Sequence, residues 1–83
     1  MPTQNKLKSV LESLLFVSGE PLKLAKIAKI CKVSKNDVAT EIEALNDDYK
    51  NSERGFAIIR KDDCVQLATN PENSQMVSQL VSG

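Results

Sequence analysis

With 83 residues and 41% hydrophobic side chains, the chain can fold into one compact domain but is too short for two cores of ordinary size. Eleven Lys and Arg balance eleven Asp and Glu, which excludes the net positive field that draws many proteins to nucleic acids or anionic membranes. The sequence has no histidine, so it lacks the commonest proton shuttle and metal ligand of proteins.

The charges are distributed unevenly along the chain. Residues 1–36 carry seven basic and two acidic side chains, a net charge of +5, whereas residues 37–83 carry four basic and nine acidic ones, a net charge of −5. We therefore expect the folded domain to have a basic and an acidic side. Such a surface suits contacts with other proteins.

A first helix is predicted over residues 5–17. Its apolar residues fall on one arc of about 160° at about 100° per residue, and they are Leu7, Val10, Leu11, Leu14, Leu15 and Val17. Gly19 follows, and glycine readily adopts the left-handed conformation that ends many helices. Because Pro21 prevents the helix from resuming, residues 19–22 should form a sharp corner.

A shorter second helix is predicted over residues 23–31. The side chains expected to face inward are those of Leu24, Ile27, Ala28 and Cys31. The other side of this helix is basic and carries Lys23, Lys26, Lys29 and Lys32. This lysine face is interpreted either as a solvated surface or as a docking site for an acidic partner.

A third helix is predicted from Ser34 to about Tyr49. Ser34 has the side chain of an N-cap, and Asp37 stands three positions later, as in a variant of the capping box. The apolar stripe of this helix consists of Val38, Ile42, Leu45 and Tyr49.

Two strands and a last helix complete the chain. Residues 56–60 and 64–69 are rich in strand-forming side chains, and they are predicted to form a β-hairpin that turns at Asp62 and Asp63. Asn70 should cap a helix that begins near Pro71. One side of that helix is apolar and carries Met76, Val77, Leu80 and Val81.

The order of these elements predicts a fold of the α+β class that is mainly α. It is a winged helix-turn-helix with a three-helix core, a two-stranded wing hairpin and a C-terminal helix, formed as a single domain by residues 1–83. Many DNA-binding proteins have this fold, so the fold alone does not decide the function.

The third helix has the wrong charge for reading DNA, although in a helix-turn-helix this element enters the major groove. Its acidic residues outside the apolar stripe are Asp37, Glu41, Glu43, Asp47 and Asp48, against only Lys35 and Lys50. Arg60 and Lys61 of the wing, or the lysines of the second helix, are too few to neutralise even about six phosphates. Direct DNA binding should be weak or absent. The alternative is a winged-helix transcriptional regulator that contacts DNA through its second helix and wing.

The sequence has none of the usual marks of an enzyme. It contains no glycine-rich phosphate loop and no nucleophile motif, so neither a catalytic residue nor a cofactor is predicted. Cys31 and Cys64 stand apart and lack metal-site spacing, which favours two buried, reduced thiols over a zinc site or a disulfide. No segment approaches the roughly 20 apolar residues of a membrane span, so a cytoplasmic protein is expected.

Residues 7–22 resemble the beginning of ScpB proteins, subunits of the bacterial SMC complex that condenses chromosomes. The ScpB pattern is an apolar helix that ends in Leu-Leu-Phe-x-Ser-Gly-Glu-Pro-Leu, and residues 14–22 read Leu-Leu-Phe-Val-Ser-Gly-Glu-Pro-Leu. The resemblance continues at the expected spacing through Arg54-Gly55 and Val65-Gln-Leu-Ala-Thr69 and covers about residues 6–81. It departs from the family in the wing, where Asp62-Asp63-Cys64 replaces a glycine turn and Val65 stands in place of a tyrosine.

The resemblance implies a non-enzymatic subunit that works by binding other proteins. It implies homodimerisation, binding of the kleisin ScpA and, through ScpA, association with SMC at the nucleoid, in chromosome condensation and segregation during the cell cycle and division. ScpB proteins resemble two winged helices in tandem, so residues 1–83 are expected to be the N-terminal domain of a longer protein.

One aromatic side chain is predicted on the side of the first helix opposite its apolar arc. Phe16 lies there near Ser9, Glu12 and Ser13. Phe16 either packs beneath the wing or the last helix, or it anchors an interface with a second copy or with the kleisin. The candidate interface comprises Phe16, Gly19, Glu20, Pro21 and Leu22.

Overall fold

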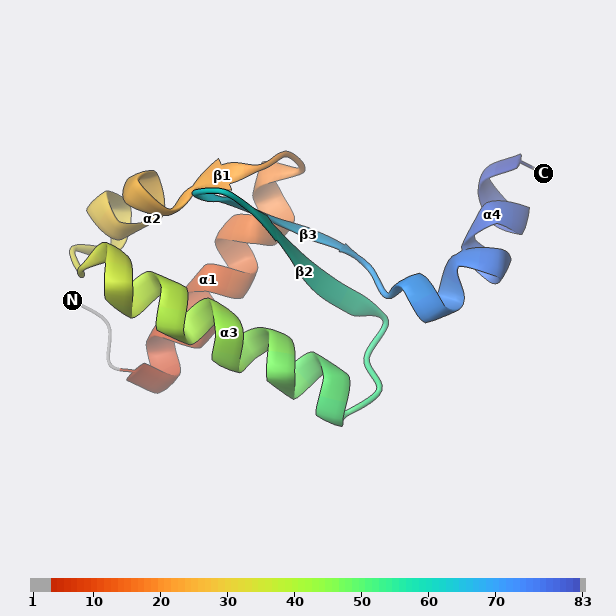
Figure 1. The fold of residues 1–83 in the computed structure, drawn as a ribbon, viewed down its shortest axis with the longest axis horizontal. Coiled ribbons are helices and arrows are strands. Elements are labelled where there is room, and N and C mark those ends of the chain that lie inside the picture. The colour runs from red at the N-terminus through yellow and green to blue at the C-terminus, as the bar shows by residue number, and fades with distance from the viewer. Residues whose placement is uncertain (1–3, 83) are drawn as a thin grey trace.

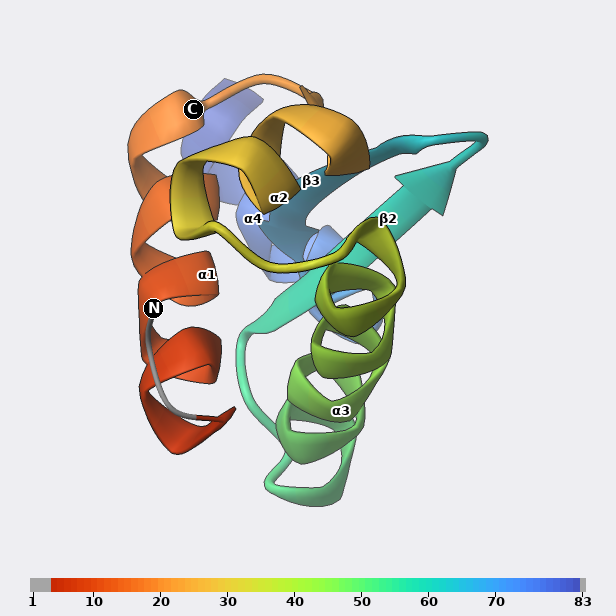
Figure 2. The same cartoon turned by 90° about the vertical axis from the view of Figure 1, so that its left-hand side faces the viewer.

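The computed structural model describes residues 4–82 of the chain (Figure 1). In chain order its elements are α1 (Gln4–Ser18), β1 (Leu22–Lys23), α2 (Leu24–Cys31), α3 (Lys35–Asn51), β2 (Phe56–Lys61), β3 (Cys64–Thr69), a 3-10 turn η1 (Pro71–Asn73) and α4 (Ser74–Ser82). This order confirms the predicted winged helix. Figure 2 shows α1 along one side of the domain and α3 along the other, with α2 between their upper ends and the β2–β3 wing behind them.

The three helices and the wing enclose one hydrophobic core. Its buried members are Leu7, Leu11, Leu15, Leu24, Ile27, Ala28, Cys31, Val38, Ile42, Leu45, Tyr49, Ile58 and Val65. The inward faces predicted for α2 and α3 are all confirmed, whereas Leu14 and Leu67 are only partly buried at the margin of the core. As predicted, Ser34 caps α3, because its Oγ accepts a hydrogen bond of 3.0 Å from the Asp37 backbone N–H.

The apolar arc predicted for α1 was wrong at one end. The buried face centres on Leu7, Leu11 and Leu15, which repeat every four residues along the helix. Val17 lies about 120° around the helix from Leu11 and is 80% exposed. The sequence pattern placed Val17 on the arc because an apolar residue extends a hydrophobic arc whether or not anything packs against it.

The wing belongs to a three-stranded antiparallel sheet in the order β1-β3-β2. The predicted hairpin is present, with Lys61 opposite Cys64 at the turn and Phe56 opposite Thr69 at the open end. On its other side β3 pairs with β1, where Leu22 lies opposite Val65. The two-residue strand β1 was not predicted, and it converts the corner after α1 into part of the sheet.

The outer edge of β2 faces α3 and is partly occupied by a side chain. Asn46 lies on α3, and its Oδ1 accepts a hydrogen bond of 2.9 Å from the backbone N–H of Ile58. An edge strand normally leaves such N–H groups free to pair with another chain. Here the Asn46 carboxamide takes that place and also joins α3 to the wing.

The tip of the wing is held against the body of the domain. The carbonyl oxygen of Asp63 accepts a hydrogen bond of 2.8 Å from the N–H of Leu24, at the start of α2. The Asp63 carboxylate lies 3.3 Å from Nζ of Lys35 on α3. Asp62 has a positive φ of 55°, which aspartate tolerates better than most residues. The tip therefore does not project freely.

The last helix stands apart from the rest of the domain (Figure 1). As predicted, Asn70 caps the segment, because its Oδ1 accepts a hydrogen bond of 2.9 Å from the Glu72 N–H. Within residues 4–82, η1 is the only element with which α4 makes more than slight contact. The radius of gyration is 13.4 Å, against about 12 Å for a compact chain of this length. The projection of α4 accounts for the difference.

The burial pattern of α1 predicts unequal effects of two truncations. Leu11 is fully buried, so Leu11→Ala should lower the free energy of unfolding by about 2–5 kcal/mol through loss of apolar contact and creation of a cavity. Val17→Ala is the matched control and should change it by no more than about 0.5 kcal/mol. Urea denaturation followed by circular dichroism measures both. Equal losses would show that the helix has been placed with the wrong rotation.

Candidate functional site

An exposed hydrophobic surface lies where α1 meets the wing. We call it the aromatic patch and define it as Phe16 of α1, Phe56 of β2 and Leu67 of β3. Phe16 is 71% exposed and Phe56 is 45% exposed, whereas Leu67 is partly buried. Phe16 therefore does not pack beneath the wing or α4, and that alternative is wrong.

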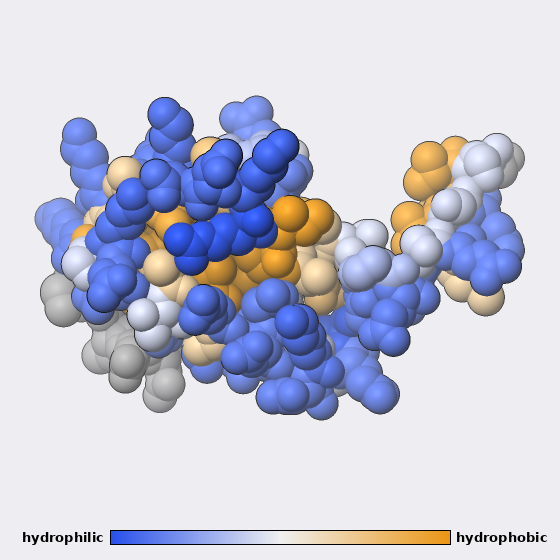
Figure 3. Space-filling view, in the orientation of Figure 1, coloured by the Kyte–Doolittle hydropathy of each residue, from blue (hydrophilic) through white to orange (hydrophobic). Residues whose placement is uncertain are grey.

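Three hollows border the aromatic patch, and Phe56 lines all of them. Two shallow ones, of about 200 and 330 Å³, are also lined by Phe16 and Leu67. The third, of about 510 Å³, runs along the outer edge of β2 beside the end of α3, and we call it the edge groove. Its lining residues are Asn46, Tyr49, Lys50, Phe56, Ala57, Ile58, Ile59, Thr69, Asn70, Pro71 and Glu72. Figure 3, which has the orientation of Figure 1, shows hydrophobic atoms exposed in the middle of the domain, over β2.

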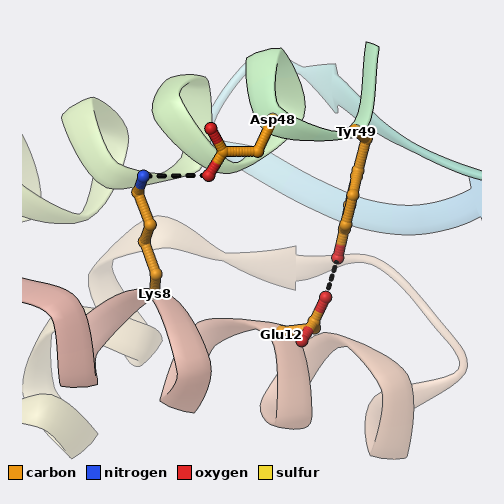
Figure 4. A network of polar contacts seen from close by, with 4 residues as sticks. All are labelled: Lys8, Glu12, Asp48 and Tyr49. Atoms are coloured by element: carbon orange, nitrogen blue, oxygen red, sulfur yellow. Dashed lines mark hydrogen bonds and ion pairs between the residues drawn. The ribbon is translucent and has the colours of Figure 1, made fainter. Parts of the chain in front are cut away.

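Two polar contacts join α1 to α3 close to this surface (Figure 4). The Tyr49 hydroxyl donates a hydrogen bond of 2.6 Å to the Glu12 carboxylate, and the Lys8 ammonium lies 2.9 Å from Asp48. The Tyr49 ring meets Phe56 edge to face, with ring centroids 6.3 Å apart. The Tyr49 ring is fixed at one end by its backbone in α3 and at the other by the hydrogen bond to Glu12, so Phe56 packs against a side chain of fixed position.

The Tyr49 phenol is held in its neutral form. Burial raises the pKa of Tyr49 above its ordinary value, and the hydrogen bond to Glu12 raises it further because that bond requires the phenol proton. The hydrogen bond to Asp48 likewise raises the pKa of Lys8.

The structure brings together only part of the predicted interface. Gly19 ends α1 with a φ of 64° and lines a hollow together with Phe16. Glu20 and Pro21 are exposed on the following corner. Leu22 is partly buried against the core and pairs with Val65, so it anchors the corner from within.

Sequence reasoning missed Phe56, the residue common to all three hollows. The sequence pattern marked it only as the start of a strand. An aromatic residue directly after the polar break at residues 51–55 was the available signal. Alternation along β2 puts Phe56 on the same side as buried Ile58, but Phe56 stands at the open end of the hairpin, where the core no longer covers it.

The charges of α3 and the wing are arranged as the sequence indicated, with one exception. The exposed acids of α3 are Asp37, Glu43, Asp47 and Asp48, whereas Glu41 is buried at 7% exposure. The buried position of Glu41 was not predicted, because the sequence analysis placed this glutamate among the acids outside the apolar stripe. The lysines of α2 are exposed, as predicted.

The two cysteines and the possible metal ligands were the other groups considered for a chemical role. Cys31 is buried, Cys64 is only partly buried, and both thiols are free. Burial raises the pKa of the Cys31 thiol, which keeps it protonated and unreactive. Across residues 4–82, no group of three or more His, Cys, Asp or Glu is arranged to hold a metal ion. In the same part of the chain, every helix is too short or too polar to cross a membrane.

Comparison with known sequences identifies relatives of this chain. Residues 9–83 match the family model described as segregation and condensation complex subunit ScpB. Segregation and condensation protein B of Clostridium botulinum is 40% identical over 78 residues, which cover 94% of this chain and 40% of the relative. The protein of the same name from Clostridium tetani is 36% identical over 80 residues, covering 94% of this chain and 42% of that protein. The chain thus spans about two fifths of the length of these curated relatives.

Solved structures have the same fold. ScpB from Mycobacterium tuberculosis superposes with a TM-score of 0.90 over 98% of this chain and 51% of that chain, at 21% identity, a level that shows the fold alone. A structure described as a dimer of the ScpB N-terminal domain complexed with ScpA peptide superposes with a TM-score of 0.84 at 31% identity. That match covers 92% of this chain and 95% of the other.

The raised pKa of Tyr49 predicts a specific loss of stability in alkali. Above the ordinary tyrosine pKa of about 10, the unfolded chain releases a proton that the folded chain keeps, so unfolding becomes more favourable as pH rises. Tyr49 should contribute a decline of at most about 1.4 kcal/mol per pH unit above that point. Tyr49→Phe should lack this contribution, while other titrating groups act on both proteins. Urea denaturation between pH 8 and pH 12 tests it, and parallel stability curves would refute it.

Proposed function

This chain belongs to the ScpB family of segregation and condensation complex subunits, and from that premise we propose that it is a non-catalytic protein-docking domain. It pairs with a second copy of itself, binds the kleisin ScpA and, through ScpA, joins SMC at the nucleoid in the cytoplasm. We also propose that residues 1–83 form one winged-helix domain that corresponds to the N-terminal domain of ScpB proteins.

The observation that carries this proposal is the aromatic patch. A phenylalanine that is 71% exposed contributes little to the stability of a single domain, and aromatic side chains are favoured anchors at protein interfaces. Phe16 and Phe56 border common hollows that a partner's side chains can fill. The similar ScpB N-terminal domain described as a dimer with an ScpA peptide supports both kinds of partner.

The interface includes the corner after α1 as well as the aromatic patch. Phe16 is the anchor, and Gly19 allows close approach because it lines a hollow without a side chain. Glu20 and Pro21 form the exposed rim. Leu22 contributes indirectly by fixing the corner to β3. We add Phe56 to the proposed interface because it lines the same two hollows as Phe16.

A DNA-binding regulator with the same fold fits the surface less well. The exposed side of α3 would set carboxylates against phosphates, and the wing tip is tied to Leu24 and Lys35 instead of projecting toward a duplex. Lys35, one of the two cations of α3, is itself engaged by Asp63. The cations that remain available to contact DNA phosphates are the lysines on the exposed side of α2, together with Arg60 and Lys61.

The aromatic patch predicts that Phe16→Ala weakens association without unfolding the domain. An aromatic anchor contributes about 2 kcal/mol or more, so dimerisation or binding of an ScpA fragment should weaken by at least about 30-fold. The unfolding free energy should change by no more than about 0.5 kcal/mol because the side chain is exposed. Analytical ultracentrifugation and calorimetric titration measure the association.

Val17→Ala is the matched control, since Val17 is 80% exposed on another side of the same helix. It should leave both kinds of association unchanged. Normal association of Phe16→Ala with itself and with ScpA would remove Phe16 from the interface.

The charge of α3 and the wing predicts weak DNA binding. At physiological salt, a fluorescein-labelled duplex should bind more weakly than the ~10⁻⁴ to 10⁻⁶ M typical of non-specific binders. The double substitution of Arg60→Glu with Lys61→Glu should change this little. Micromolar binding with a steep salt dependence that the double substitution abolishes would favour the regulator instead.

A further inference from the structure

We infer that the lysine face of α2 docks an acidic segment of a partner protein, in which glutamates or aspartates surround one apolar side chain. The lysine face consists of Lys23, Lys26, Lys29 and Lys32, and all four side chains are exposed. It lies at the turn end of the wing hairpin, because Lys23 pairs with Cys64, whereas Phe56 of the aromatic patch stands at the open end. The inference therefore concerns a second surface and does not depend on the homodimer proposed above.

The positive charges of the lysine face are not neutralised by the domain itself. Across residues 4–82, none of its four ammonium groups has an ion-pair partner. The carboxylate of Asp63, at the adjacent wing tip, pairs with Lys35 of α3 instead. Successive lysines of the face are three residues apart, so they are neighbours along α2 and repel one another. Carboxylates from a partner would relieve this repulsion.

Lys23 stands where a helix favours another residue. It is the N-cap of α2, with φ −72° and ψ 135°, and its side chain makes no capping hydrogen bond. Ser34 has a similar backbone conformation at the start of α3, and its hydroxyl does cap that helix. A cation at the N-terminus of a helix also opposes the helix dipole. The lysine at position 23 therefore weakens the start of α2.

Lys32 is likewise a poor residue for its position. It ends α2 in the left-handed conformation, with a φ of 57°, where glycine is the usual residue. Its ammonium group gains no hydrogen bond or ion pair within the described part of the chain, and neither does that of Lys23. Residues that break a local structural rule without a compensating contact are candidates for a functional role.

An exposed apolar side chain beside the lysines favours a protein partner over a nucleic acid. Ile30 is 54% exposed and stands one helical turn after Lys26. A phosphate backbone would leave Ile30 in water, whereas an apolar side chain of a protein segment can cover it. Lys23 and Lys32 are nine positions apart, which is about 13 Å along a helix axis. About four residues of extended chain span that distance.

The wing places a fifth cation next to the lysine face. Cys64 pairs with Lys23 on one side and with Lys61 on the other. Paired residues project from the same face of a sheet, and neighbouring strands are about 4.8 Å apart. The backbones of Lys23 and Lys61 are therefore about 10 Å apart, in positions that the sheet fixes. An acidic segment can contact α2 and the wing together.

The test uses a short fluorescein-labelled peptide in which glutamates flank one leucine, titrated with the 83-residue chain and followed by fluorescence anisotropy. Lys26→Glu reverses a charge in the lysine face and should weaken binding by at least about tenfold. The domain should remain folded, because Lys26 is exposed and a glutamate near the start of a helix complements its dipole.

Arg54→Glu is the matched control, since it makes the same change of charge in the loop after α3, remote from α2 (Figure 2). Salt screens charges over about 8 Å, so binding should stay within about twofold of wild type. Ile30→Ser should weaken binding of the leucine peptide but not of a peptide with serine in place of the leucine.

Two further substitutions separate a docking role from a structural one. In Lys23→Ser the hydroxyl supplies the missing N-cap, and in Lys32→Gly the glycine accepts the left-handed conformation, so each should raise the melting temperature. Each also removes a cation from the lysine face and should weaken binding of the peptide. Lysines that serve only the fold would not give this combination of a more stable domain with weaker binding.

The other results overturn the inference. They are failure of the wild-type chain to bind the peptide at millimolar concentration, equal binding by wild type and Lys26→Glu, and equal weakening by Arg54→Glu. Duplex DNA that binds as tightly as the peptide, is weakened equally by Lys26→Glu and leaves Ile30→Ser without effect on either ligand would assign the face to nucleic acid. None of these substitutions alters the aromatic patch, so dimerisation and ScpA binding remain independent measurements.

Discussion

The structure depends on the burial of Val65 in the central strand. Its side chain is fully buried, and its backbone lies between Leu22 of β1 and Arg60 of β2. One residue therefore connects the corner after α1, the wing and the three-helix core. Because β3 is paired on both sides, the position of the corner and the position of the hairpin cannot vary independently. This arrangement also fixes the relative positions of the two aromatic side chains of the patch, because Phe16 precedes the corner and Phe56 belongs to the hairpin.

The domain separates the residues that stabilise it from those available for binding. The core is completed by one face of each of the first three helices and by Ile58 and Val65. Phe16, Phe56 and the apolar side of α4 remain outside it. In a domain this small, stability is only about 5–15 kcal/mol, so a partner that covers these residues adds a substantial share. Folding and assembly are therefore expected to be coupled energetically, although the core forms within one chain.

Sequence periodicity predicted the elements that are amphipathic and several turns long, and the cap at Ser34 came from a short-range hydrogen bond that sequence specifies directly. It did not predict β1, because two residues have no periodicity and pair only through contact with distant β3. It misplaced Val17 and Glu41, since both lie at the margin of a helical face where the neighbouring elements decide burial. Phe16 was identified because it breaks the pattern of its helix. Phe56 was missed because its exposure depends on where the core ends.

The hydrogen bond from Ile58 to Asn46 also bears on how many copies can assemble. A sheet with an open edge can add strands without limit and grow into fibrils. Here one edge is the two-residue strand β1, too short to act as a template, and the other carries the Asn46 carboxamide. Strand addition is thereby disfavoured at β1, which offers only two residues, and at Ile58 of β2, whose N–H is already bonded. Any association of this domain is therefore expected to use side-chain surfaces, which can close into complexes of defined size, instead of open-ended strand pairing.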